Sequence, residues 1–343
     1  MPMKFLVIGT GAIGIYLGGN LALNHHNVVF IARKGSVNAI KKAGLEICKK
    51  KEKIHQPFPS VFSNIKEAFG KNNFDAVIIT VKAYDVDQVI VQLKPFICEI
   101  KALVCFQNGV GTEEKFGCVF GKQKVISGII TSSVSRLSVG SVRLEKDRGM
   151  GLSSINKVVF DLIDVFNDAG FKTKYYEKAQ DLKWSKLVSN LFANASSAIL
   201  EMTPKEIFSN PRLFELEMAQ IKEAMQVMKS RGWNIVNLPG IPLKLLTRMI
   251  ESLPVELNQA ILGKILASGR GEKMPSFYID LVRGSLKNEV EYLNGAVVQE
   301  GEKLNIPTPV NRLYNQVLTE MIHGNRNIGE FRHNPDKLID LIS

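Results

Sequence analysis

Cysteine is scarce in this sequence, and its four copies show no pairing pattern. The 343 residues contain Cys48, Cys98, Cys105 and Cys118, none of which forms a C-x-x-C pair or has a histidine at metal-ligand spacing. A disulfide framework or a zinc site needs such spacing. We therefore expect four reduced thiols, no bound metal and a cytoplasmic protein.

Long apolar runs, repeats and low-complexity segments are also missing. No apolar stretch approaches the roughly 20 residues that cross a bilayer, and the chain opens directly on a strand. We therefore expect neither a membrane span nor a signal peptide. The composition, 45% hydrophobic and 22% charged residues, is typical of a globular protein. At this length we expect two domains.

Acidic residues are fewer than basic ones, since 33 against 44 give a net charge of +11. Such an excess can indicate nucleic-acid binding. The basic residues, however, are spread along the chain, and their one dense run, from Lys49 to Lys53, has no interleaved aromatic residue. We interpret that run as a solvated hairpin or loop and expect no nucleic-acid partner. A positive field would also favour anionic cofactors and substrates.

Glycines near the N-terminus carry the first functional signal. Residues 3–8 predict a buried strand, 12–24 a helix and 28–32 a second strand, with glycines at G-x-G-x-x-G spacing after the first strand. In such a unit the glycines allow a tight turn, close approach of a pyrophosphate and close helix packing. The phosphate binds at the helix N-terminus. The pattern predicts a nucleotide site, the alternative being a turn kept only for packing. The residues of the predicted site are Gly9, Thr10, Gly11, Ala12, Ile13 and Gly14.

The second strand ends in basic residues. Proteins that prefer NAD usually carry an acid here, which binds the ribose 2′-hydroxyl. This chain carries Arg33 and Lys34 instead, and a guanidinium can bind a 2′-phosphate through two parallel hydrogen bonds. We therefore predict NADP(H) as the cofactor. The alternative is that both residues are solvated loop charges.

Two later strands end in polar residues. Residues 74–82 and 101–106 predict buried parallel strands, which end at Lys82 and just before Asn108. Open α/β sheets bind their ligands beyond the carboxyl ends of the strands. We therefore expect Lys82 and Asn108 to edge the cofactor site. The alternative for Asn108-Gly109 is a tight turn.

The pattern of the chain changes near Tyr176. Before it, strands and helices alternate, and after it the periodicity is helical, interrupted at prolines. We expect an α/β, Rossmann-type dinucleotide-binding domain over residues 1–176, followed by an all-α domain over 177–343 that carries the substrate and catalytic residues.

The first helix of the second domain is expected to run through D-L-K-W-S-K-L-V-S-N-L-F-A-N-A-S-S-A-I. Lys186, Asn190 and Asn194 fall at i, i+4 and i+8, so they would share one helical face among apolar neighbours. A lysine in that setting can protonate a carbonyl oxygen as hydride arrives at the carbon, and amides can hold a hydroxyl or carboxylate. The alternative is a solvated polar stripe.

A second polar group lies in residues 274–295. Pro275 and Ser276 predict a helix start, with Ser276 capping the helix or binding ligand, and Glu289 is expected to open a further helix. A buried Glu289 near Lys186 would keep the lysine charged or accept a hydrogen bond from a substrate hydroxyl. Alternatively, Glu289 is only an acid favoured by the helix dipole. The spacing alone does not decide between these.

These motifs occur in an order that resembles the ketopantoate reductases (2-dehydropantoate 2-reductases). They are G-T-G-A-I-G, the strand end with Arg33, T-V-K-A-Y-D, Q-N-G-V-G, W-S-K-L-x-x-N-x-x-x-N and E-V-E-Y-L-N-G. The resemblance covers about residues 3–320, and its last two motifs are more specific than the glycine turn. It implies an NADP-dependent oxidoreductase that reduces 2-dehydropantoate to (R)-pantoate, a step toward pantothenate and coenzyme A.

The resemblance also implies roles for individual residues. Lys186 would be the general acid at the keto oxygen, and Glu289 would engage the substrate. Lys82 would lie near the nicotinamide or the substrate carboxylate. The implied substrate-binding residues are Asn108, Asn190, Asn194 and Ser276, with Asn108 also meeting the cofactor. A helical second domain in this family can form a dimer surface, so a homodimer is one expectation.

Two other functions fit the residues. One is an NADPH-dependent reductase of another 2-keto acid or of an imine, because the apolar wall residues that set specificity cannot be located from the pattern. The other is a non-catalytic dinucleotide-sensing protein, which would not need Lys186 and Glu289 in one cleft.

Overall fold

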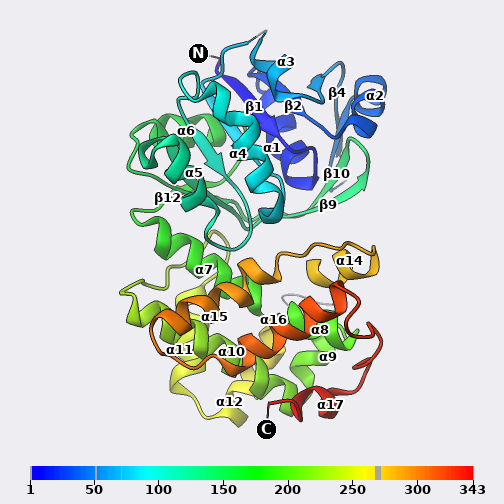
Figure 1. Ribbon diagram of the computed structural model, residues 1–343, viewed down its shortest axis with the longest axis vertical. Coiled ribbons are helices and arrows are strands. Elements are labelled where there is room, and N and C mark those ends of the chain that lie inside the picture. The colour runs from blue at the N-terminus through cyan, green and yellow to red at the C-terminus, as the bar shows by residue number, and fades with distance from the viewer. Residues whose placement is uncertain (1, 51, 71, 267–271, 343) are drawn as a thin grey trace. The chain divides into compact units, whose positions relative to one another are not determined.

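Strand β1 (Lys4–Ile8) belongs to an eight-stranded sheet in the computed structural model of this protein (Figure 1). The structure describes residues 2–50, 52–70, 72–266 and 272–342. All neighbouring strands of this sheet are parallel except β8 and β11. In pairing order the strands are β12 (Thr173–Tyr175), β11 (Met150–Ser153), β8 (Val125–Ile130), β7 (Leu103–Cys105), β6 (Ala76–Ile79), β1, β2 (Asn27–Ile31) and β5 (Ser60–Phe62).

The chain forms two compact units. The first comprises residues up to 107, 111–183 and 238–241, and the second comprises 108–110, 184–237 and 242–343. Helix α7 (Ala179–Leu191) contributes residues to both units. The domain boundary near Tyr176 stays a prediction.

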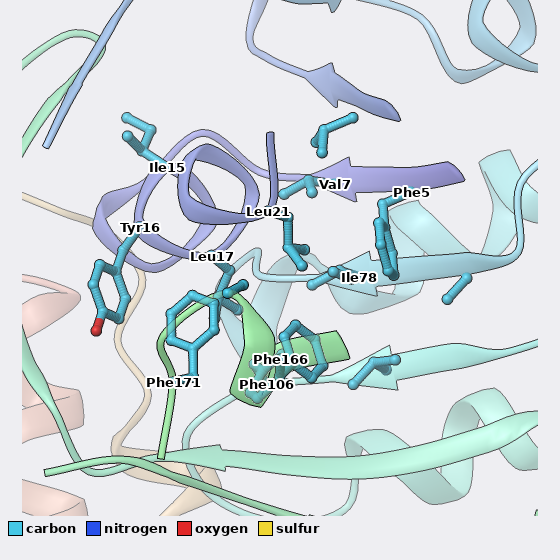
Figure 2. Close-up of a cluster of buried hydrophobic side chains, with 14 of the residues drawn as sticks. Phe5, Val7, Ile15, Tyr16, Leu17, Leu21, Ile78, Phe106, Phe166 and Phe171 are labelled. Atoms are coloured by element: carbon cyan, nitrogen blue, oxygen red, sulfur yellow. The ribbon is translucent and has the colours of Figure 1, made fainter. Parts of the chain in front are cut away.

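Alternation along β1 explains how the sheet is covered on both faces. Phe5 and Val7 lie in one apolar cluster, whereas Leu6 and Ile8 lie in another, because successive side chains of a strand point to opposite faces. The first cluster includes α1 (Ala12–Leu23) and α6 (Val158–Asp168), and Figure 2 shows Phe5 and Val7 beside the apolar side chains of α1. The second includes α3 (Ile65–Phe69), α4 (Val86–Leu93) and α5 (Thr112–Phe120).

The carboxyl ends of the neighbouring strands are level. Ile8 of β1 pairs with Ile31 of β2 and with Ile79 of β6. The segments that follow these strands therefore begin at the same edge of the sheet, which is where parallel sheets bind ligands. Those segments carry the glycine turn, Arg33 and Lys82.

A smaller sheet accompanies the first. Its pairing order is β4 (Glu52–Gln56), β3 (Leu45–Lys49), β10 (Ser141–Lys146) and β9 (Ser133–Ser138). The antiparallel strands β3 and β4 contain Lys49 and Lys53, and Lys50 and Lys53 are exposed, which confirms the predicted hairpin. Lys51 lies outside the described residues. Helix α2 (Lys34–Ala43) and the short 3-10 turns η1 (Ala83–Asp85), η2 (Lys94–Phe96) and η3 (Lys122–Lys124) complete this part of the chain.

The second unit is helical. Proline occupies the first turn of several of its helices, where the missing N–H costs nothing, and Pro204 and Pro211 thus confirm the predicted interruptions at prolines. No helix among the described residues is long and apolar enough to cross a membrane. Besides part of α7, the elements are α8 (Ala195–Leu200), α9 (Pro204–Ser209), α10 (Pro211–Ser230), α11 (Leu243–Ser252), α12 (Val255–Asn258), a π-helical turn η4 (Gln259–Gly263), α14 (Ser276–Val282), η5 (Val290–Tyr292), α15 (Asn294–Lys303), α16 (Pro309–Ile322) and α17 (Pro335–Ile339). The predicted α/β and helical parts are both confirmed.

Candidate functional site

The turn after β1 needs glycine at two positions for steric reasons. Gly9 has φ of +107°, a conformation that L side chains rarely adopt, and its N–H donates to the Ile31 carbonyl oxygen at 3.1 Å. A Cβ at Gly14 would lie only 1.8 Å from the Gly9 carbonyl oxygen. The turn and the helix are therefore in direct contact, as the predicted roles of these two glycines require.

Gly11 is different, because it has open space beside it. A Cβ built there would find none of the described atoms within 4 Å. Gly11 is the N-cap of α1, and this helix start has neither a side-chain cap nor an acidic residue in its first turn among the described residues. Its first N–H groups and the positive end of the helix dipole are thus available to an anion. The half-buried Thr10, Ala12 and Ile13 surround this helix start, which fits the pyrophosphate of a dinucleotide.

Arg33 follows β2 and is the N-cap of α2. Its side chain is 89% exposed, and its guanidinium lies 3.7 Å from the carboxylate of Asp85. An ion pair this exposed is worth little, so the guanidinium can turn to another anion at small cost. Lys82 follows β6 as the N-cap of the η1 turn and is half-buried. Both residues lie where the cofactor prediction needs them, and their roles remain proposals.

Gly14 contacts Gly9, whereas Gly11 has open space beside it. Substitution of Gly14 should therefore affect stability, and substitution of Gly11 should affect cofactor binding. Gly14→Ala should lower the free energy of unfolding by at least about 1–3 kcal/mol, because the added methyl overlaps the backbone. Gly11→Ala should change it by less than about 1 kcal/mol, the scale of an altered cap, but weaken NADPH binding roughly tenfold or more by blocking the phosphate. Denaturant unfolding and NADPH titration measure the two effects. Unchanged NADPH affinity in Gly11→Ala would remove the glycine turn from the site.

In the second unit, the segment 108–110 packs against α7 and η5. The Asn190 side-chain amide donates to Asn108 Oδ1 at 3.3 Å, and the Val110 N–H donates to the Tyr292 carbonyl oxygen at 3.2 Å. Gly109 has φ of +79°, as the tight-turn alternative requires, and a Cβ there would lie 2.2 Å from the same oxygen of Tyr292. The turn therefore brings Asn108 to Asn190.

Helix α7 ends earlier than predicted. The prediction that Lys186, Asn190 and Asn194 share one helical face is therefore wrong for Asn194, which lies beyond the end of α7. The helix stops at Leu191, Ala193 has φ of +47°, and Asn194 is the N-cap of α8. The break is stabilised by Glu217, whose carboxylate accepts the Ala193 N–H at 2.5 Å. Lys186 and Asn190 stay one turn apart on α7, and both are half-buried.

Asn194 and Ser276 meet at the start of α14 in a way that corrects the predicted cap. Pro275 is the N-cap, and Ser276 occupies the first helical position and is exposed. The N-cap residue makes no side-chain capping hydrogen bond to the described part of this helix. Instead, Asn194 Oδ1 accepts the Phe277 N–H at 3.4 Å, with Asn194 only 5% exposed. The capping role predicted for Ser276 is wrong, because a neighbouring segment supplies the acceptor. Ligand binding by Ser276 remains untested.

Glu289 is 2% exposed and immediately precedes η5. The single helix expected from Glu289 onward is therefore a short 3-10 turn followed by α15. Glu289 is the N-cap of η5, but it is the side chain of Asn288, one residue earlier, that accepts the Val290 N–H, at 2.9 Å. Burying a carboxylate costs free energy, and an acid can complement a helix dipole while it stays exposed to water. The burial of Glu289 therefore favours the alternative in which it has a specific partner.

The buried charged residues Lys183 and Glu217 were not predicted from the sequence. Lys183 is 4% exposed and Glu217 is 0% exposed. The available signal was position, because both stand inside amphipathic helices where charge normally faces water. Their partners, Glu113 and the broken end of α7, lie far away in the sequence.

The uncapped N-terminus of α1 follows a glycine turn at the carboxyl edge of the parallel strands. This arrangement is typical of a dinucleotide-binding α/β protein. Residues 5–157 match the family model described as "Ketopantoate reductase PanE/ApbA", and residues 178–324 match that described as "Ketopantoate reductase PanE/ApbA C terminal". The chain belongs to the ketopantoate reductase family.

Relatives agree along nearly the whole chain. A 2-dehydropantoate 2-reductase of Pyrococcus horikoshii is 28% identical over 319 residues, which are 91% of this chain and 95% of that protein. The fold is similar to that of a PanE/ApbA family ketopantoate reductase from Ralstonia eutropha JMP134, with a TM-score of 0.79, 23% identity and coverage of 94% and 99%. It is also similar to that of D-mandelate dehydrogenase solved with NADH and anilino(oxo)acetate, with a TM-score of 0.79, 18% identity and the same coverage.

Proposed function

We propose that this protein reduces 2-dehydropantoate to (R)-pantoate with NADPH, as a cytoplasmic enzyme of pantothenate and coenzyme A synthesis. The observation that carries the proposal is the match of both parts of the chain to one family, together with relatives of that name along more than nine-tenths of the sequence. A dinucleotide-binding reductase of this family acts on a small keto acid.

Each residue of the proposed site has its own role in the reduction. NADPH, when bound, supplies the hydride that adds to the keto carbon. Lys186 gives a proton to the keto oxygen, so that the carbonyl becomes an alcohol without a free alkoxide. Asn190 and Asn108, already bonded to each other at 3.3 Å, offer amide groups for the hydroxyl or carboxylate of the substrate. Glu289, almost fully buried, accepts a hydrogen bond from the substrate or from the lysine.

A second candidate is the reduction of a different 2-keto acid. The similarity in fold to D-mandelate dehydrogenase favours it, because that protein was solved with a 2-keto acid analogue. The test is the loss of nicotinamide absorbance when purified protein is mixed with NADPH and ketopantoate, then with a panel of 2-keto acids and imines. The proposal requires ketopantoate to have the highest kcat/KM. A higher value for another compound would replace it with the second candidate.

Cofactor choice rests on Arg33, for which we propose contact with the 2′-phosphate. Arg33→Ala should raise the Kd for NADPH by about 10–100-fold, the value of one or two charge-assisted hydrogen bonds. The Kd for NADH should change little, because NADH lacks that phosphate. Lys34→Ala is the matched control, since Lys34 is the next residue and is also basic and exposed. Equal effects of both substitutions would indicate a general positive field rather than a contact, and a wild-type preference for NADH would reverse the assignment.

A further inference from the structure

A buried ion pair lies in the first unit near the end of β7. The Lys183 ammonium is 2.7 Å from Glu113 Oε1, and the two side chains are only 5% and 10% exposed. The same ammonium donates to the main-chain carbonyl oxygen of Gln107, also at 2.7 Å. Burial, with the Glu113 charge adding to it, raises the pKa of the adjacent Cys105 thiol well above its ordinary value, as expected where water is excluded.

Such a pair is a poor device for stability alone. Removing two charges from water is costly for each ion, and a well-packed apolar pair is often as stable or more so. A buried pair does, however, fix geometry, because the ammonium must stay beside its carboxylate while it donates to the Gln107 carbonyl oxygen. Glu113 also lies in the first turn of α5, where the helix dipole favours its charge.

The pair holds the ends of two strands that deliver proposed site residues. Gln107 follows β7, and its side-chain amide donates to the carbonyl oxygens of Ile79 at 3.0 Å and Val81 at 3.2 Å, at the end of β6. The residues next in sequence are Lys82 after β6 and Asn108 after Gln107. Lys183 itself precedes Lys186 by three residues, which is less than one turn of α7.

We propose that the Lys183–Glu113 pair is a positioning element for the reduction, a role that rests on the proposed function. By gripping the Gln107 carbonyl, Lys183 sets where α7 runs relative to the end of β7. It thereby holds Asn108, the residue after Gln107, and the turn of α7 that leads to Lys186. Lys183 contacts neither substrate nor cofactor in this account and acts through its neighbours. Loss of the grip would affect kcat more than cofactor affinity.

Two substitutions separate positioning from stability. Lys183→Met leaves the Glu113 carboxylate buried without its ammonium, so both Tm and kcat should fall. In the double variant Lys183→Met with Glu113→Gln no uncompensated charge remains, so Tm should recover. The Gln107 carbonyl still lacks its donor, so kcat should stay about 10–100-fold low, the scale expected for a misplacement near 1 Å. KM for NADPH should change less than about threefold in both, because the glycine turn and Arg33 are untouched.

A matched control is available on α5, the helix that carries Glu113. Lys115 of α5 pairs with Asp87 at 2.8 Å, but with side chains 40% and 69% exposed, so Lys115→Met should alter neither Tm nor kcat appreciably. If the double variant regains wild-type kcat together with its Tm, the pair is structural only and the proposal is overturned. The same holds if Lys183→Met keeps wild-type kcat.

Failure of the proposed function would look different. Wild-type protein that reduces no 2-keto acid would overturn the function, whatever the variants do. Positioning is then decided by hydrogen exchange in the stable double variant. Faster exchange of the amides of residues 108–110 than in the wild type is expected if the grip fixes this segment. Unchanged exchange there would overturn the inference independently of turnover.

Discussion

Lys186→Ala should lower kcat for ketopantoate reduction by about 10²–10⁴-fold, the usual contribution of a positioned general acid. The Kd for NADPH should stay within about threefold of the wild type, because the substitution removes a proton donor and leaves the glycine turn intact. Stopped-flow turnover and fluorescence titration of NADPH measure the two quantities. Lys186 is half-buried on α7, one turn before Asn190, and the variant keeps the hydrogen bond between Asn190 and Asn108.

The control is Lys178→Ala. Lys178 is exposed and lies just before the same helix, so its loss changes the net charge equally without touching the proposed site. Equal loss of kcat in both variants would point to the overall field. A Lys186→Ala variant with full turnover would discard the general-acid role. A protein that binds NADPH tightly, yet turns over no substrate before or after substitution, would fit the dinucleotide-sensing alternative.

The nucleotide-binding half could be predicted closely because its signals are local. The run from β1 to β2 contains its own strand, turn, helix and strand, and the glycine spacing reports steric needs that hold wherever the rest of the chain goes. The predicted helix 12–24 is Ala12–Leu23, and the predicted strand 28–32 is Asn27–Ile31. Differences of one or two residues at such ends are ordinary.

The helical half was harder because its breaks are set by distant residues. In F-A-N-A-S-S the alanines favour helices and neither glycine nor proline is present, so the asparagine and serines are the only residues there that are common at helix ends. The break at Ala193 is stabilised by Glu217, which is 24 residues away in the sequence. For the same reason the cap of α14 could not be assigned to Asn194, whose amide comes from 83 residues away. Periodicity finds helices, but tertiary hydrogen bonds decide where they stop.

The residues that break α7 also carry the largest stability effect we expect. Glu217 is completely buried, and its carboxylate accepts three hydrogen bonds, from the Ala193 N–H at 2.5 Å, the Gln220 amide at 2.7 Å and the Tyr314 hydroxyl at 3.2 Å. Burial, aided by the Glu217 charge, raises the pKa of Tyr314 well above its ordinary value, so its hydroxyl keeps its proton and donates. The carboxylate is thus the common acceptor of three buried donors.

Glu217→Leu should therefore lower the free energy of unfolding by about 3–5 kcal/mol, because it leaves buried donors without an acceptor. Tyr314→Phe removes a single donor and should cost about 0.5–1.5 kcal/mol. Glu217→Gln should fall between them, since its amide oxygen still accepts while its NH₂ faces donors. Urea unfolding followed by circular dichroism measures the order, and equal losses in Glu217→Leu and Tyr314→Phe would contradict it.

Because Ala193 separates Asn190 from Asn194, the folded fraction of Glu217→Gln should also show a raised KM for ketopantoate. A normal KM there would mean that the break in α7 supports the fold without shaping the substrate site.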